Sequence, residues 1–237
     1  MTAQLNGPRL NPARGAARQL VVFLHGYGAD GNDLIELGRQ WRELLPEATF
    51  VSPHAPQGLP GASGGRQWFS LSSAAPEDPR GADERWRGVT AARPSIDAFL
   101  DSELAKLGLD DSRLALVGFS QGAMMALHVG LRRRRAPAAI VSYSGLLVGS
   151  EHLAEATARN AKDEYPPLLL VHGDQDPVIP LEAMFAAMDD FGRATIPVQW
   201  HLSFGVAHGI DAGGLRHGGL FLAEGLGVKA RRPARAV

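Results

Sequence analysis

Short runs of hydrophobic residues alternate along the chain with longer segments in which apolar positions recur every three or four residues. Uninterrupted apolar runs are typical of strands covered on both faces, and the longer segments have the period of a helix. This alternation predicts an α/β fold with a mostly parallel central sheet and helices on both faces. Strands are predicted at 19–25, 48–52, 113–119, 138–142, 168–172 and 198–204, and helices at 32–45, 94–107, 123–135 and 181–191, with a last helix near His217.

Three segments do not follow this alternation. Residues 1–18 are expected to be a flexible lead-in and 226–237 a solvated basic tail to one domain that spans 1–237. Residues 54–88 are rich in Pro, Gly and Ser, and a long loop of this kind is often functional. Two roles remain open for Trp68 and Phe69 in this loop: they line a substrate pocket, or they pin the loop to the core.

Composition and charge narrow the class of protein. The chain has no cysteine, which excludes disulfides, cysteine-ligated zinc and a cysteine nucleophile, and no metal site is predicted. A net charge of −1 gives no indication of nucleic-acid binding. No stretch has the roughly 18 apolar residues of a membrane span, and the N-terminal residues lack the apolar segment of a secretory signal. We therefore expect a cytoplasmic protein with no nucleic-acid partner and no stable membrane insertion.

The strongest chemical signal is the segment Gly118-Phe-Ser-Gln-Gly122, which matches the G-x-S-x-G nucleophile elbow. A predicted strand enters the segment and a predicted helix leaves it. Such a turn holds the serine in a strained conformation and presents its hydroxyl at the end of the sheet, while the glycines allow strand and helix to approach closely. Ser120 is therefore predicted to be a catalytic nucleophile. A chance match is the alternative, and the flanking strand and helix argue against it.

A serine hydroxyl needs a base, which at a nucleophile elbow is a histidine that follows the acid in the chain. His208 comes directly after the strand predicted at 198–204 and is favoured over His217, which lies near the last helix. The acid is expected between Ser120 and His208, after the strand predicted at 168–172.

Two carboxylates compete for this role. Pro177 biases Asp176 toward an extended backbone, which would turn its carboxylate toward a partner. Asp174 follows Gly173 and is typical of a turn residue that bonds local amides. Asp176 is therefore favoured as the residue that orients the imidazole.

The backbone amides of Tyr27 and Gln121 are predicted to form the oxyanion hole, because they lie after the first strand and after the nucleophile. The segment Gly26-Tyr-Gly-Ala-Asp-Gly31 also spells the dinucleotide fingerprint G-x-G-x-x-G. The acidic residue expected about twenty positions later is missing, since the second strand ends in Pro53-His54. A dinucleotide-binding oxidoreductase is therefore the weaker hypothesis.

Five motifs together resemble the phospholipase/carboxylesterase family, which includes acyl-protein thioesterases and small bacterial carboxylesterases. The resemblance implies an α/β-hydrolase fold without a large lid domain, no cofactor, and hydrolysis of acyl esters. It also implies Ser120, Asp176 and His208 as catalytic residues, Tyr27 and Gln121 as oxyanion donors, and an aromatic pair at 68–69 near the substrate. The motifs are Leu24-His-Gly-Tyr-Gly-Ala-Asp-Gly31, Gly118-Phe-Ser-Gln-Gly-Ala123, Tyr143-Ser-Gly145, His172-Gly-Asp-Gln-Asp-Pro-Val-Ile-Pro180 and Val206-Ala-His-Gly209.

The sequence thus predicts a serine hydrolase that cleaves carboxylic acyl esters through a covalent acyl-enzyme, with thioesters and lysophospholipids as further candidate substrates. An acyltransferase or peptidase using the same residues is an alternative. A non-catalytic binding protein of the same fold is another, against which the intact serine, aspartate and histidine argue. Apolar residues around Trp68 are candidates for a homodimer interface instead of an acyl contact.

Overall fold

The computed structural model describes residues 5–59, 64–71, 79–157 and 165–228. Within these ranges one seven-stranded sheet has the order β1-β3-β2-β6-β7-β8-β9, and β4 (Gln57–Gly58) pairs with β5 (Arg66–Gln67) in a separate ribbon. The strands β2, β3, β6, β7, β8 and β9 are parallel, whereas β1 pairs antiparallel with β3. The sheet strands are β1 (Arg9–Leu10), β2 (Gln19–Leu24), β3 (Ala48–Val51), β6 (Leu114–Phe119), β7 (Ala139–Tyr143), β8 (Leu168–Gly173) and β9 (Val198–Ser203).

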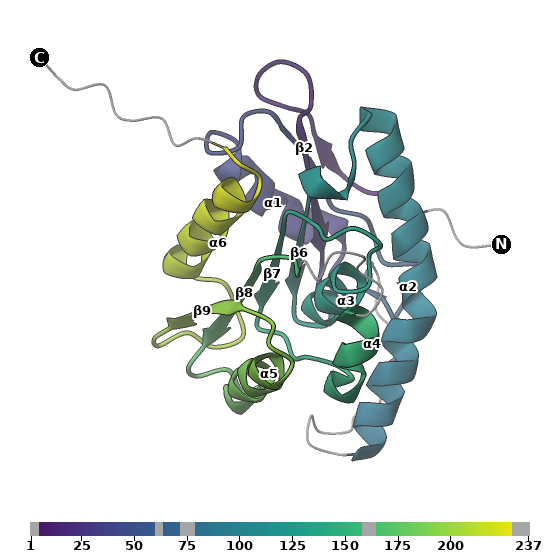
Figure 1. Cartoon of the computed structure of the whole chain (residues 1–237), viewed down its shortest axis with the longest axis vertical. Helices are drawn as coiled ribbons and strands as arrows, with labels where there is room; N and C mark the ends of the chain where they lie inside the picture. The colour runs from purple at the N-terminus through teal and green to yellow at the C-terminus, as the bar shows by residue number, and fades with distance from the viewer. Residues whose placement is uncertain (1–4, 60–63, 72–78, 158–164, 229–237) are drawn as a thin grey trace, which may run out of the picture.

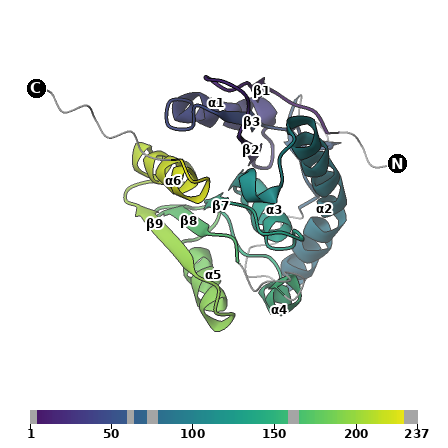
Figure 2. The same ribbon diagram turned by 45° about the horizontal axis from the view of Figure 1, so that its top comes forward.

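Helices cover both faces of this sheet (Figures 1 and 2). Alternate residues of β2 explain why: Leu20, Val22 and Leu24 pack in one hydrophobic core, and Val21 and Phe23 pack in the other. The first core contains side chains of α2 (Pro79–Leu107), α3 (Gln121–Gly130), α4 (Leu153–Thr157) and α5 (Glu182–Arg193), and the second contains those of α1 (Gly31–Trp41) and α6 (Ala212–Gly225). Short 3₁₀ turns are η1 (Asp111–Arg113) and η2 (Ser150–His152).

The predicted strands agree with the sheet to within one residue at each end, and the helices differ more. The helix predicted at 94–107 begins at Pro79 instead. A proline suits the first turn of a helix, but Pro94 lies inside α2, where it removes one backbone hydrogen bond. The signal for the longer helix is the buried series Val89, Ala92 and Ile96, spaced three and four residues apart.

Part of the expected flexible lead-in instead contacts the sheet, which Arg9–Leu10 join as β1. Leu5 is buried, β1 pairs with β3, and Arg9 forms an ion pair with Glu103 of α2. Backbone hydrogen bonds to an edge strand have no hydrophobic period, which is why the sequence pattern did not reveal this pairing. The expected basic tail lies outside the described residues from 229 onward, and before it Leu226 is buried against the α6 side of the sheet.

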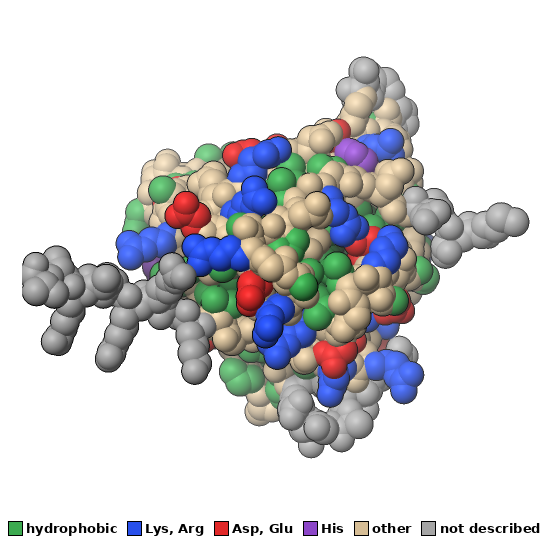
Figure 3. Space-filling model, turned by 90° about the horizontal axis from the view of Figure 1, so that it is seen from above, with side chains coloured by type: hydrophobic (Ala, Val, Ile, Leu, Met, Phe, Trp, Pro, Cys, Tyr) green, Lys and Arg blue, Asp and Glu red, His purple; other side chains and the backbone are tan. Residues whose placement is uncertain are grey.

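On the face seen in Figure 3, basic and acidic side chains lie interspersed among apolar and uncharged ones. This face therefore carries no large patch of one charge. None of the helices in the described part of the chain has the length and apolarity required to cross a membrane.

Candidate active site

Ser120 stands at a sharp turn between β6 and α3. Its backbone has φ 53° and ψ −117°, a conformation that non-glycine residues rarely adopt and that costs about 1–3 kcal/mol. A Cβ at Gly118 would clash with the backbone of Gly122 and Ala123, and one at Gly122 would clash with the Leu24 carbonyl. Strand and helix therefore approach closely only because both flanking residues are glycine. This is the local geometry predicted from the G-x-S-x-G pattern.

Asp176 and His208 are hydrogen-bonded to each other. The distance from His208 Nδ1 to Asp176 Oδ2 is 2.7 Å, and the amides of Val178 and Ile179 donate to Asp176 Oδ1 at 2.8 and 2.9 Å. Burial of the Asp176 carboxyl raises its pKa, but the hydrogen bonds from His208, Ile179 and Val178 outweigh burial and lower the pKa below its ordinary value. The carboxylate is thus held in one orientation with one oxygen directed at the imidazole.

Asp174 and His217, the alternative candidates for the acid and the base, contact other residues. Asp174 Oδ1 accepts a hydrogen bond of 2.6 Å from the amide of Gly205, which lies on the loop after β9 and is not one of the local amides predicted. His217 lies on α6, where its ring stacks on His201 at a centroid distance of 4.2 Å. Neither side chain takes part in the contact between Asp176 and His208.

His208 lies beside the elbow. Its ring contacts that of Phe119, the residue before Ser120, at a centroid distance of 4.8 Å. The hydrogen bonds of the described residues include none between Ser120 Oγ and His208, so these two side chains are not joined in this structure. Catalytic hydrogen bonds are often longer before substrate binds and tighten in its complex.

The loop after β2 closes the other side of the site. A Cβ at Gly26 would lie 3.5 Å from Ser120 Cβ, and the amides of Gly28 and Arg66 bond the carbonyls of Arg66 and Ala29 at 2.9 and 3.0 Å. The hydrogen bonds between described residues use neither the Tyr27 amide nor that of Gln121. Both predicted oxyanion donors are therefore available to a substrate oxygen.

The glycines of the fingerprint segment have structural roles. Gly28 has φ +84°, and a Cβ at Gly31 would clash with the Ser52 carbonyl. Asp30 caps α1 by accepting a hydrogen bond of 2.7 Å from the Asn32 amide. Close packing of α1 on β3 thus accounts for residues that otherwise suggest a dinucleotide site.

Trp68 and Phe69 are buried, with exposed fractions of 1% and 3%. Trp68 Nε1 donates to the His25 carbonyl at 2.8 Å, and the Gln121 side chain accepts from the Trp68 amide and donates to the Phe69 carbonyl at 2.9 and 2.7 Å. Of the two roles left open, this favours pinning the loop to the core. Trp68 itself offers no exposed surface for a homodimer, which stays a prediction.

Two buried histidines that the sequence did not single out support the site. His25 accepts a hydrogen bond on Nε2 from the Ala55 amide at 3.0 Å, and its Nδ1 lies 2.8 Å from the Gly26 carbonyl. His172 Nε2 lies 2.8 Å from the Ile179 carbonyl and 3.5 Å from Asp176 Oδ2. His25 thereby holds the loop after β2, and His172 holds the loop that contains Asp176. Both stand in motifs quoted for the family resemblance, at the end of an apolar run, but neither was given a role of its own.

The sheet order, the helices on both faces and the elbow between β6 and α3 define the α/β-hydrolase class. The chain belongs to the phospholipase/carboxylesterase family of carboxylic ester hydrolases, whose model matches residues 5–223.

Similar proteins agree with this family. The solved structure of esterase PE8 is 42% identical, with a TM-score of 0.85 over 94% of this chain and 99% of that one. Acyl-protein thioesterase 1 of Schizosaccharomyces pombe is 32% identical over 76% of this chain and 78% of its own length. Arabidopsis thaliana SOBER1 shares the fold at 22% identity, with a TM-score of 0.75 over 89% of this chain and 100% of that one.

Proposed function

We propose that the protein hydrolyses carboxylic acyl esters through a covalent acyl-enzyme formed on Ser120, with His208 as the base and Asp176 as the residue that orients it. The observation that carries the proposal is the 2.7 Å contact between His208 Nδ1 and Asp176 Oδ2 beside a serine with φ 53°. Family membership and the names of the similar esterase and thioesterase support ester or thioester substrates.

Each chemical step has a residue suited to it. With Asp176 accepting the Nδ1–H of His208, the other ring nitrogen is free to take the proton of Ser120 as the hydroxyl attacks the carbonyl carbon. The amides of Tyr27 and Gln121 stabilise the negative oxygen of the tetrahedral intermediate. His208 then gives its proton to the leaving alcohol or thiol, and water repeats the sequence to release the acid.

Apolar side chains around the site indicate the kind of acyl group. Tyr27 is 48% exposed on the oxyanion loop, and Val178 and Phe204 are 53% and 80% exposed on the loops after β8 and β9. Their exposed apolar surface favours an acyl chain of several carbons over an acetyl group. Lysophospholipids and thioesters with such a chain are included in the proposal.

The test is hydrolysis of p-nitrophenyl esters from acetyl to palmitoyl by the wild type, Ser120→Ala and Ser144→Ala. Ser144 is the matched control, because it is also a buried serine with positive φ, and its Oγ has no hydrogen-bond partner among the described residues. We expect Ser120→Ala to lose activity by a factor on the order of 10⁴ or more, and Ser144→Ala to keep it. Full activity of Ser120→Ala would refute the nucleophile, and inactivity of the wild type on every ester would refute the reaction. Adding glycerol distinguishes hydrolysis from acyl transfer.

A further inference from the structure

One imidazole stands directly before the loop that follows β2. His25 is fully buried, and its Nε2 lies 3.0 Å from the backbone amide of Ala55. An amide N–H can only donate, so Nε2 is the acceptor and the ring proton is on Nδ1. Burial lowers the pKa of His25, which keeps the ring neutral near neutral pH and leaves this tautomer in place.

The Nδ1–H of His25 donates to the carbonyl of Gly26 at 2.8 Å. The amide of Ala29 donates to the same carbonyl at 3.3 Å and closes a turn that begins at Gly26. The third residue of this turn, Gly28, has φ +84°, as a type II turn requires at that place. The Gly26 carbonyl is therefore held from two sides, and the contact with His25 is the shorter one.

The Gly26 carbonyl and the Tyr27 amide belong to one trans peptide unit. Such a unit is planar, and its C=O and N–H point in opposite directions. The bond from His25 to the carbonyl therefore directs the Tyr27 N–H away from His25. That N–H has no partner in the hydrogen bonds of the described residues, and a Cβ at Gly26 would lie 3.5 Å from Ser120 Cβ. The peptide unit thus presents a free donor beside Ser120.

Buried contacts connect this peptide unit to the other proposed oxyanion donor, the Gln121 amide. Trp68 Nε1 donates to the His25 carbonyl at 2.8 Å, and the indole contacts the imidazole at a centroid distance of 5.2 Å. The Trp68 amide donates to the Gln121 side chain at 2.9 Å. The exposed fractions of His25, Trp68 and Gln121 are 0%, 1% and 0%. The relative position of the two donors is thereby set inside the fold before a substrate arrives.

We propose that His25 is a positioning residue for acyl transfer, because its Nδ1–H bond to the Gly26 carbonyl directs the Tyr27 amide at the negative oxygen of the tetrahedral intermediate. This role rests on the function proposed for Ser120. His25 itself contacts neither the substrate nor the reacting atoms. A donor that is held in place before the charge develops needs no reorientation during the reaction, which is what makes it effective.

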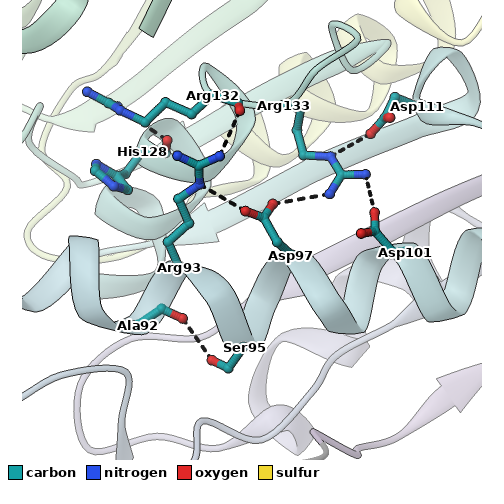
Figure 4. Close-up of polar contacts among 9 residues, drawn as sticks. All are labelled: Ala92, Arg93, Ser95, Asp97, Asp101, Asp111, His128, Arg132 and Arg133. Atoms are coloured by element: carbon teal, nitrogen blue, oxygen red, sulfur yellow. Dashed lines mark hydrogen bonds and ion pairs between the residues drawn. The ribbon is translucent and has the colours of Figure 1, made fainter. Parts of the chain in front are cut away.

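Two amide side chains separate the two contacts of the ring. The nitrogen of asparagine takes the place of Nδ1, so His25→Asn keeps a donor for Gly26 and loses the acceptor for Ala55. The oxygen of glutamine takes the place of Nε2, so His25→Gln keeps the acceptor and loses the donor. Each variant lacks one buried hydrogen bond, and similar falls in Tm are expected. The control is His128→Gln, because His128 is also a buried histidine and lies beside Arg132 at the end of α3 (Figure 4).

Steady-state hydrolysis of a p-nitrophenyl ester distinguishes positioning from folding. Loss of a whole oxyanion donor lowers kcat by a factor of about 10²–10³. His25→Gln keeps the turn bond from Ala29, so its kcat is expected to fall by a factor of about 10–100, with KM within about twofold. His25→Asn and His128→Gln are expected to keep kcat within about threefold. An alkylboronic acid forms a tetrahedral anion on a serine hydroxyl, and its affinity for His25→Gln should fall by a factor similar to the fall in kcat.

NMR of the ring nitrogens in the wild type tests the contact without any substitution. The shifts of His25 are expected to be those of a neutral ring protonated on Nδ1, and a ring protonated on Nε2 would overturn the proposal. Equal losses of kcat in His25→Asn and His25→Gln would also overturn it, as would a folded His25→Gln with the kcat of the wild type. In those cases wild-type activity that is lost in Ser120→Ala leaves the proposed function standing. Inactivity of the wild type on every ester, or full activity of Ser120→Ala, would refute both.

Discussion

At the scale of single residues, Asp174 and Asp176 follow the same strand two positions apart and contact different partners. Asp174 bonds the Gly205 amide and so ties the loop after β8 to the loop after β9. Asp176 bonds His208 through one oxygen and two amides of its own loop through the other. The first contact shapes the loop, and the second holds an imidazole in one tautomer.

Replacing each aspartate by asparagine separates these two roles. Asp176→Asn is expected to lower kcat by a factor on the order of 10⁴, because an amide stabilises the wrong tautomer of His208 and not its charged form. Asp174→Asn keeps an oxygen acceptor for the Gly205 amide and is expected to keep most of the activity. Steady-state kinetics on one ester checks both variants, and equal losses would contradict the assignment of the acid.

Asp176 also makes stability depend on pH. Because its pKa is lowered in the folded protein, the ionised carboxyl stabilises the fold above its ordinary pKa, and this stabilisation is lost as pH falls through the lowered value. The stability difference between wild type and Asp176→Asn should therefore shrink from pH 6 to about pH 2.5. Urea unfolding at both pH values measures it. A difference that stays constant or grows on acidification would be evidence against a lowered pKa.

The sequence could single out Ser120, Asp176 and His208 as candidates because each follows a recognisable strand. It could not predict that the Gln121 side chain binds residues 68–69, since these partners lie far away in the chain and the loop that contains them has no hydrophobic period. For the same reason His172 could not be paired with the Ile179 carbonyl. Polar contacts of this kind depend on the folded backbone and leave no pattern of their own.

At the scale of elements, one arginine joins α2 to the start of β6. Arg133, with a side chain 8% exposed, follows α3 and bonds Asp97 and Asp101 of α2 and Asp111 of η1. Arg135 bonds only Asp110 among the ion pairs of the described residues, and both side chains of that pair are more than half exposed. Arg133 thus forms its ion pairs from a buried position, whereas the ion pair of Arg135 is exposed to solvent.

Arg133→Met is expected to lower the free energy of unfolding by about 3 kcal/mol, because it leaves partly buried carboxylates without their shared partner. Arg135→Met should cost less than about 1 kcal/mol, since exposed pairs are screened by solvent. Urea unfolding of both variants makes the comparison. Equal effects would show that burial does not determine the strength of these pairs.

The start of α2 shows why the ends of a helix are harder to predict from the sequence than its presence. Pro94 suggests a boundary, but the side chains of Val89 and Ala92 continue the buried stripe on the N-terminal side of it. Packing against the sheet outweighs the one hydrogen bond that proline removes. Strand ends were predicted more closely where the strand is buried throughout, as in β2, β7 and β8.

At the scale of the whole molecule, the N-terminal residues close the edge of the sheet. β1 covers β3, and Arg9 reaches Glu103 of α2, whose side chain is 2% exposed. Burial raises the pKa of Glu103, but hydrogen bonds from Lys106 and Arg9 outweigh it and lower the pKa. A segment with no predicted structure thus connects the sheet edge to the longest helix.

Deletion of residues 1–10 is expected to lower Tm by about 5 °C, because it removes this pairing and one partner of a buried carboxylate. The exposed edge of β3 should also promote aggregation. Arg9→Met isolates the ion pair and should have a smaller effect than the deletion. Differential scanning calorimetry with light scattering measures both consequences. An unchanged Tm in the deletion variant would mean that the edge pairing adds no stability.

The central claim is that Ser120 carries the acyl group during turnover, and trapping that intermediate tests it most directly. The protein is mixed with a p-nitrophenyl ester, quenched in acid during the first turnovers, and analysed by intact mass and peptide mapping. We predict a mass increase equal to the acyl group, located on the peptide that contains Ser120 and absent from Ser120→Ala. An acyl group on another residue, or one that persists in Ser120→Ala, would contradict the account.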